Sequence, residues 1–245
     1  MTVNRILRPL GLVAALALSF ASVPAVAHEH GAHAAAPVVS AAQAAVAEIP
    51  ALAARYALQV GKQRTDWYLW RDKDTVETAN TAVGQNNLWE RLADGSYHYR
   101  RVFNQEQRVV EYVPGELRAR NAEPDWRTLS SVVSPLLLEQ LKRGASRTLF
   151  GQKATHYSGV AGGRPIDLWW LERDQIPASL RIGSGADAQR MRLVDVRVEA
   201  PDSWPRASES RIAAYALLDA SDLGDMESDP FVARLLQAEG HSHAH

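Results

Sequence analysis

Short runs of β-forming residues, separated by glycine and proline, constrain the fold of this chain more than any other feature. They form two blocks, one between residues 64 and 118 and one between residues 146 and 198. Asp94-Gly95, Pro114-Gly115 and Gly162-Gly163 are typical turn pairs between them. Regularly spaced short strands with such turns predict an antiparallel sheet. The expected strands are 67–70, 75–78, 88–91, 97–103, 109–113, 146–150, 154–160, 166–171, 179–182 and 191–198.

The run 97–103 alternates large side chains in the way that a strand requires. Successive side chains of a strand point to opposite faces. One face is predicted to carry Tyr97, Tyr99 and Phe103, and the other His98, Arg100 and Val102.

Helices are predicted before, between and after the two blocks. Ser134 and Pro135 suit the start of a helix whose leucines run from 136 to 141 and which Gly144 ends. Asp229 and Pro230 start another, which runs to about Ala238. Upstream, Pro50 precedes a segment, 51–60, that Gly61 ends in the way a glycine ends a helix.

This order of elements predicts an α+β fold, mostly antiparallel, with a curved, half-barrel-like sheet and a few packed helices. We expect one such domain over residues 51–238. A flexible arm rich in histidine and alanine precedes it at residues 28–50, and a histidine-rich tail follows at residues 239–245.

Residues 1–27 have the three parts of a secretion signal: Arg5 and Arg8, the apolar run 10–20, and Ala25-Val26-Ala27 as the cleavage site. The apolar run is too short to span a membrane comfortably. We therefore expect a soluble, periplasmic protein whose signal peptide is cleaved and which does not span the membrane.

Composition excludes several classes of protein. The chain has no cysteine, which excludes disulfides, thiolate metal sites and thiol catalysis. Its formal charge of -1 argues against a nucleic-acid partner, which favours a basic face. The length remaining after signal cleavage is enough for one sizeable core.

Three local patterns resemble the periplasmic lipoprotein-carrier (LolA/LolB/RseB-like) half-barrel superfamily. The first combines Trp89-Glu90-Arg91 with residues 97–101 and 110–112. The second combines His156-Tyr157-Ser158-Gly159 with residues 166–170. The third is the segment 176–181, in which a proline is followed closely by a leucine and an arginine. Together they cover about residues 64–198.

The resemblance implies a concave apolar surface that binds an acyl chain, a lipid, a lipoprotein or an unfolded partner. Seven aromatic residues are candidates for its lining: Trp67, Trp70, Trp89, Tyr97, Tyr99, Phe103 and Trp170. The alternative is that these side chains are core and pack against the 136–141 helix, as aromatic residues in sheets commonly do.

Histidine gathers at the two ends of the chain. His28, His30 and His33 follow the signal, and His241, His243 and His245 close the sequence. Cleavage after residue 25 or 27 exposes an amino terminus with histidine in third position, a nitrogen set that suits copper or nickel. The C-terminal three are either a weak site alone, part of a zinc or copper site shared with the arm, or a solubilising tail.

No catalytic motif is found. The sequence lacks a nucleophile elbow, a phosphate loop and a zinc helix. The acidic residues between 219 and 229 fit a calcium loop poorly and suit a helix start. His98 and His156 would support a reaction only if one lay in a cleft beside a carboxylate.

The sequence therefore predicts an exported periplasmic binding protein, not an enzyme, whose histidine tails bind or deliver copper, zinc or nickel. The alternative is a carrier or sensor of lipid, acyl chain or lipoprotein. The candidate partners are a transition-metal ion and a lipid, a lipoprotein or another periplasmic protein.

Overall fold

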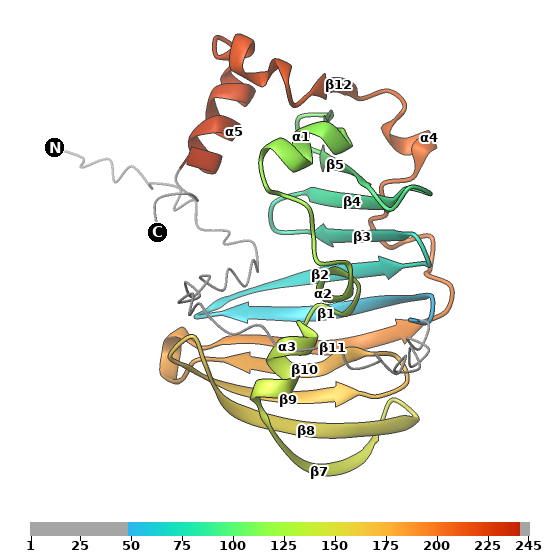
Figure 1. Ribbon diagram of the computed structural model, residues 1–245, viewed down its shortest axis with the longest axis vertical. Helices are drawn as coiled ribbons and strands as arrows, with labels where there is room; N and C mark the ends of the chain where they lie inside the picture. Colours follow the sequence, from blue (N-terminus) through green and yellow to red (C-terminus); the bar gives the residue numbers. More distant parts are fainter. Residues whose placement is uncertain (1–48, 241–245) are drawn as a thin grey trace, which may run out of the picture. The chain divides into compact units, whose positions relative to one another are not determined.

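The computed structural model describes residues 49–240 and contains one twelve-stranded sheet (Figure 1). The strand order is β12-β6-β5-β4-β3-β2-β1-β11-β10-β9-β8-β7. Every neighbouring pair is antiparallel except β12 and β6, which are parallel. The sheet is open and curved, so the predicted α+β, half-barrel-like class is confirmed.

The strands extend most of the predicted runs by a few residues. The first half of the sheet contains β1 (Leu52–Val60), β2 (Gln63–Arg71), β3 (Thr75–Asn80), β4 (Gln85–Arg91), β5 (Tyr97–Phe103) and β6 (Arg108–Tyr112). The second half contains β7 (Lys142–Leu149), β8 (Gln152–Ala161), β9 (Arg164–Leu171), β10 (Ile176–Ile182) and β11 (Gln189–Arg197). The four-residue β12 (Ala216–Asp219) was not predicted.

The segment 51–60 is a strand, and its reading as a helix was wrong. Strand β1 lies between β2 and β11 and joins the two halves of the sheet. Its Ala53, Ala54 and Tyr56 are all buried, so both faces of the strand are covered. Long-range pairing on both sides outweighs the small helix preference of alanine.

One segment connects the two ends of the sheet by crossing a face of it. Residues 113–141, here called the cover segment, run from β6 to β7 and contain α1 (Pro114–Ala119), α2 (Trp126–Ser131) and α3 (Pro135–Gln140). Figure 1 shows this segment passing over the strands in between. Ser134 and Pro135 start α3 as predicted, but α3 ends at Gln140, and Gly144 lies inside β7.

Alternation along the strands gives the sheet two chemically distinct faces. The face under the cover segment, here called the covered face, carries buried apolar residues from the central and second-half strands: Tyr56, Leu69, Ile166, Leu168, Leu180, Met191 and Leu193. The cover segment contributes Val133, Leu137 and Leu141 to the buried set.

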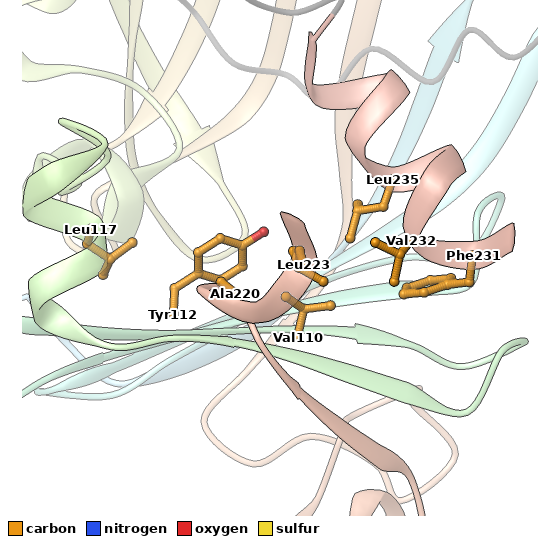
Figure 2. Packing of buried hydrophobic residues seen from close by; sticks show 8 residues of the cluster. All are labelled: Val110, Tyr112, Leu117, Ala220, Leu223, Phe231, Val232 and Leu235. Atoms are coloured by element: carbon orange, nitrogen blue, oxygen red, sulfur yellow. The ribbon is translucent and has the colours of Figure 1, made fainter. Parts of the chain in front are cut away.

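The helix α5 (Pro230–Gly240) closes the first half of the sheet. Asp229 caps it, because its Oδ1 accepts a hydrogen bond from the backbone N–H of Phe231 at 2.8 Å. Figure 2 shows the cluster that α5 forms with β6, α1 and the short helix η2 (Asp222–Met226). The predicted last helix is thus confirmed, including its cap.

The opposite face is packed by the chain that leaves β11. Trp204 stacks edge-on against Tyr68 and Trp70, with ring centroids 5.2 and 6.2 Å away. Ala207 and Ile212, the latter in α4 (Glu209–Ile212), join Val102 and Val109 in a second cluster on this face. No helix within residues 49–240 is long and apolar enough to cross a membrane.

Candidate binding sites on the two faces of the sheet

A buried arginine joins the cover segment to the sheet. Arg71, at the end of β2, is 3% exposed. Its guanidinium donates hydrogen bonds to the carbonyl oxygens of Ser130 in α2 (2.7 Å), Asp174 (2.7 Å) and Pro50 (2.9 Å). Burial lowers the pKa of Arg71 to about 10, which leaves the side chain charged at neutral pH. One cation therefore ties three separate parts of the backbone together.

Two hydroxyl groups at this interface have no hydrogen-bond partner. The Tyr56 hydroxyl and the Ser130 Oγ are buried and unpaired. Burial raises the pKa of the Tyr56 hydroxyl, which keeps it neutral. Buried polar groups in native proteins nearly always form hydrogen bonds. Two hydroxyls without a hydrogen bond beside a buried cation therefore leave this interface incompletely hydrogen-bonded.

The cover segment is also strained between α2 and α3. Val132 has φ 67°, in the left-handed region that β-branched residues avoid. Each of the three helices in this segment has only six residues. Short helices draw little stability from their own hydrogen bonds and depend on the surface they pack against.

The seven aromatic residues proposed to line a concave surface do not all share a face. Strand register puts six of them on the covered face and Trp70 on the opposite one. Four of the six pack against the cluster around α5: Trp89, Tyr97, Tyr99 and Phe103. Trp67 lies beside Tyr56, with centroids 5.6 Å apart, and Trp170 is buried in β9.

Those four aromatic residues also contact one another or neighbouring rings. Trp89 stacks on Tyr99 with centroids 3.9 Å apart, and Tyr97 stacks on Trp126 of α2. Phe103 meets Phe231 of α5 edge-on at 4.9 Å. Phe103 thus packs on α5 and Tyr97 on α2, and the cluster that these four residues join contains no residue of the predicted 136–141 helix. Whether any of the seven contacts a ligand stays a prediction.

The opposite face has a groove of ≈ 840 Å³ between the sheet and residues 198–211. Trp70 and Trp204 lie in its wall beside charged side chains from β3, β4 and β5. Its centre is Glu77, 6% exposed, whose carboxylate accepts hydrogen bonds from the Ala207 N–H (2.7 Å), Asn86 (2.7 Å) and Arg206 (3.3 Å). Burial nevertheless raises the pKa of Glu77.

His98 lies in this groove between two carboxylates. Its Nε2 is 3.0 Å from Glu111 Oε1, and its Nδ1 is 3.9 Å from Glu90 Oε2. Beside it, Arg100 pairs with Glu209 at 2.6 Å. Within residues 49–240 no hydroxyl group hydrogen-bonds to His98, and the hydroxyl residues Thr75 and Ser208 are also part of the groove lining.

The other histidines have different surroundings. His156 Nε2 is 3.1 Å from Asp167 Oδ2, and its ring lies 5.1 Å from Trp169. The six histidines proposed as metal ligands lie outside the described residues. Among residues 49–240 no group of three or more histidine and acidic side chains is arranged to hold a metal ion.

No model of a protein family and no curated protein matches the sequence. Three solved structures with a similar course of the chain are PNGF-II, the Pseudomonas aeruginosa MucA/MucB complex and a putative outer membrane lipoprotein-sorting protein domain from Vibrio parahaemolyticus. The PNGF-II match covers 72% of this chain at 10% identity and TM-score 0.40. The MucA/MucB match covers 64% at 12% identity and TM-score 0.35. The Vibrio match covers 60% at 9% identity and TM-score 0.25.

The matched regions are parts of larger chains in two of these cases. This chain spans 33% of PNGF-II and 56% of the matched MucA/MucB chain, against 85% of the Vibrio domain.

Several residues of the two candidate sites could not be recognised from any sequence pattern. Arg71, Glu77 and Trp204 stand in no motif, and their partners lie between 9 and 136 positions away along the chain. A buried charge is found only when the fold is known, because burial depends on distant segments.

Proposed function

We propose that this protein is an exported, periplasmic carrier that binds an acyl chain or another apolar group between the cover segment and the covered face of the sheet. The ligand would lie on the apolar rows of β1, β2 and β9–β11, with the cover segment displaced from them. A lipid, a lipidated protein or a free fatty acid would supply such a group.

One observation carries this proposal: the cover segment is fastened to an apolar sheet face by an interface that is not fully satisfied. The buried Arg71 donates to the Ser130 carbonyl, while the Tyr56 and Ser130 hydroxyls have no partner. Opening would let water pair with the two hydroxyls, which lowers the free-energy cost of separating the cover segment from the sheet.

Strain and short helices support the same conclusion. The left-handed Val132 raises the energy of the closed arrangement. Opening would expose apolar surface on the sheet, and an acyl chain gains roughly 0.8 kcal/mol for each buried CH₂ group. A ligand with a long chain therefore offsets the cost of opening.

Binding is tested with 11-(dansylamino)undecanoic acid, whose fluorescence rises in apolar surroundings. The probe should bind the protein and be displaced by palmitate. An Arg71→Met variant should bind it several-fold more tightly, because the open form becomes more populated. Absence of probe binding to both proteins would refute the carrier function, and Arg190→Met, the same replacement at an exposed arginine on the opposite face of β11, is the matched control.

We also propose that the terminal histidines bind copper, zinc or nickel. This second function rests on the six histidines of the two ends and on the third-position histidine that signal cleavage would expose. Calorimetric titration of each metal into mature protein, with and without residues 28–33 and 241–245, tests it. Metal binding that is unchanged by the truncation would refute this proposal.

A further inference from the structure

One end of the sheet is formed by basic turns. Six neighbouring strands, in the order β2-β1-β11-β10-β9-β8, are joined there by three turns, residues 61–62, 183–188 and 162–163 (Figure 1). The basic end, as it is called here, comprises these turns and the strand ends beside them, residues 60–64, 160–164 and 181–190. It contains five basic residues and one acidic residue, Asp187.

The five cations of the basic end have no acidic partner. All of them are exposed: Lys62, Arg64, Arg164, Arg181 and Arg190. None forms an ion pair with an acidic residue of residues 49–240. Two turns at the opposite end of the strands, 72–74 and 172–175, contain four carboxylates and two basic residues. The two ends of the sheet therefore differ in the sign of their charge.

Register places three of these arginines in one row on the face opposite the cover segment. Arg181 of β10 is the direct partner of Arg190 of β11, and Gln59 of β1 separates Arg190 from Arg64 of β2. Adjacent strands are about 4.8 Å apart, so the row is about 14 Å long. Arg192, two residues further along β11, is exposed on the same face. Like charges directly opposite each other destabilise a sheet, so Arg181 and Arg190 cost stability unless an anion binds them.

Two carboxylates on this face lie beside the row without neutralising it. Asp167 of β9 is the direct partner of Arg181, but its Oδ2 lies 3.1 Å from His156 Nε2. Asp66 lies two residues from Arg64, away from the turn, and forms no ion pair within residues 49–240. A guanidinium donates two parallel hydrogen bonds to a phosphate group, so a row of exposed arginines favours phosphate as its anion.

Two exposed valines lie at the same end of the sheet. Val60, at the end of β1, is 46% exposed, and Val160, near the end of β8, is 66% exposed. Their strands are four positions apart, so the valines are about 19 Å apart, with the arginines of β10 and β11 between them. A single small anion does not reach across this distance. A membrane surface presents many phosphates and, just beneath them, apolar chains, and basic residues beside exposed apolar ones are typical of proteins that bind it.

We propose that the basic end binds the surface of a membrane that contains anionic phospholipid. Arg64, Arg181 and Arg190 bind lipid phosphates, and Val60 and Val160 contact the outer part of the acyl-chain layer. The arginine row lies on the face opposite the cover segment, so membrane binding requires no ligand beneath that segment and does not depend on the proposed acyl-chain site.

Membrane binding is tested by sedimenting the full chain with vesicles of phosphatidylcholine alone, or of equal parts phosphatidylcholine and phosphatidylglycerol. The mixed vesicles should bind the protein at least about tenfold more tightly, and added salt should remove the difference, because it screens the attraction between arginines and phosphates. An acyl-chain site would take chains from both kinds of vesicle, so the preference for anionic lipid separates the two proposals.

An Arg181→Gln/Arg190→Gln variant should bind mixed vesicles at least about tenfold more weakly. Its fold should be retained, since the change removes two like charges that face each other. The matched control is Arg118→Gln/Arg127→Gln, which removes two exposed arginines of α1 and α2 and should bind as the wild type does. All three proteins keep residues 1–48 unchanged, so any contribution of that segment to binding is common to them. Arg190→Met should weaken vesicle binding while leaving binding of the dansyl probe unchanged.

A label at Val160 shows whether this position reaches the lipid. The chain has no cysteine, so Val160→Cys can be labelled at one site with the polarity-sensitive fluorophore NBD. Its emission should shift to the blue with mixed vesicles, whereas the same label at Leu217→Cys, exposed on β12 at the far edge of the sheet, should not respond. The proposal is overturned if both kinds of vesicle bind equally, if both double variants weaken binding equally, or if both labels respond alike. Binding of poly-glutamate without binding of vesicles would assign the basic end to an acidic protein and would also overturn it.

Discussion

At the scale of single residues, Arg71 and the hydroxyls near it have opposite effects on the free energy of unfolding. Arg71 satisfies three backbone carbonyls that would otherwise be buried without a donor. Tyr56 and Ser130 each bury a hydroxyl that gains nothing in return. A buried hydroxyl without a partner costs roughly 1–3 kcal/mol relative to water.

Replacing Arg71 with methionine should therefore lower the free energy of unfolding by about 3 kcal/mol, because the carbonyls of Pro50, Ser130 and Asp174 lose their donor. Urea denaturation followed by tryptophan fluorescence measures this change. A loss below about 1 kcal/mol would contradict the role given to this side chain.

Tyr56→Phe and Ser130→Ala should each leave the free energy of unfolding unchanged or raise it by up to about 1 kcal/mol. Thr155→Val is the matched control, since the buried Thr155 hydroxyl does have a partner, Glu172 Oε1 at 2.7 Å. The control should lower stability by about 1 kcal/mol. If Tyr56→Phe were as destabilising as the control, its hydroxyl would have a partner after all.

The buried Glu77 should make the free energy of unfolding depend on pH. Burial raises its pKa above the ordinary value of 4.5, so the folded state holds this proton more tightly than the unfolded chain does. The corresponding stability is fully present below pH 4.5 and is lost as pH rises through the folded pKa. Glu77→Gln should remove this slope, so the stability of the wild type relative to the variant falls as the pH rises above 4.5. Parallel stability curves for the two proteins would contradict the assignment.

At the scale of elements, the end of the cover segment packs against the sheet where Leu141 meets Gly159 of β8. A Cβ at Gly159 in β8 would lie 2.9 Å from Leu141 Cδ2, closer than side-chain carbons approach. Glycine at this position lets the end of the cover segment reach the sheet.

Gly159→Ala should lower the free energy of unfolding by about 1 kcal/mol, because Leu141 must shift. Gly115→Ala is the opposite case: a Cβ at this helical position meets nothing, so α1 should gain about 0.5–1 kcal/mol. Differential scanning calorimetry of the two variants separates them by sign, and a stabilising Gly159→Ala would contradict the close contact.

An element could be predicted from the sequence when its own residues carry the pattern, and could not when it depends on pairing with distant strands. Runs such as 97–103 alternate strongly, and β5 begins and ends where the pattern predicts. The β1 strand is rich in alanine, so its identity depends on β2 and β11, which no local pattern reveals. Gly144 does not end α3, because β7 pairs with β8 from Lys142 onward.

The same limit applies to the candidate sites. Alternation correctly separated Tyr97, Tyr99 and Phe103 from His98 and Arg100. The aromatic list still mixed two faces, because the register between β1, β2 and β3 decides where Trp70 points. The groove joins β1–β5 to a segment more than 100 residues later, and no sequence pattern links them.

At the scale of the whole described domain, one sheet separates two candidate sites of different chemistry. The covered face is apolar and lies under a short-helix segment with strained and unpaired groups. The opposite face has an open groove with acidic and aromatic walls. The proposed acyl-chain site lies on the covered face alone.

Hydrogen exchange of the full chain, measured by mass spectrometry with and without saturating palmitate, tests the central claim most directly. The account predicts that palmitate changes exchange in the cover segment, residues 113–141, and in β9–β11, while residues 198–211 stay unchanged. Exchange that is unaffected in the cover segment, or altered only around residues 198–211, would contradict binding beneath that segment.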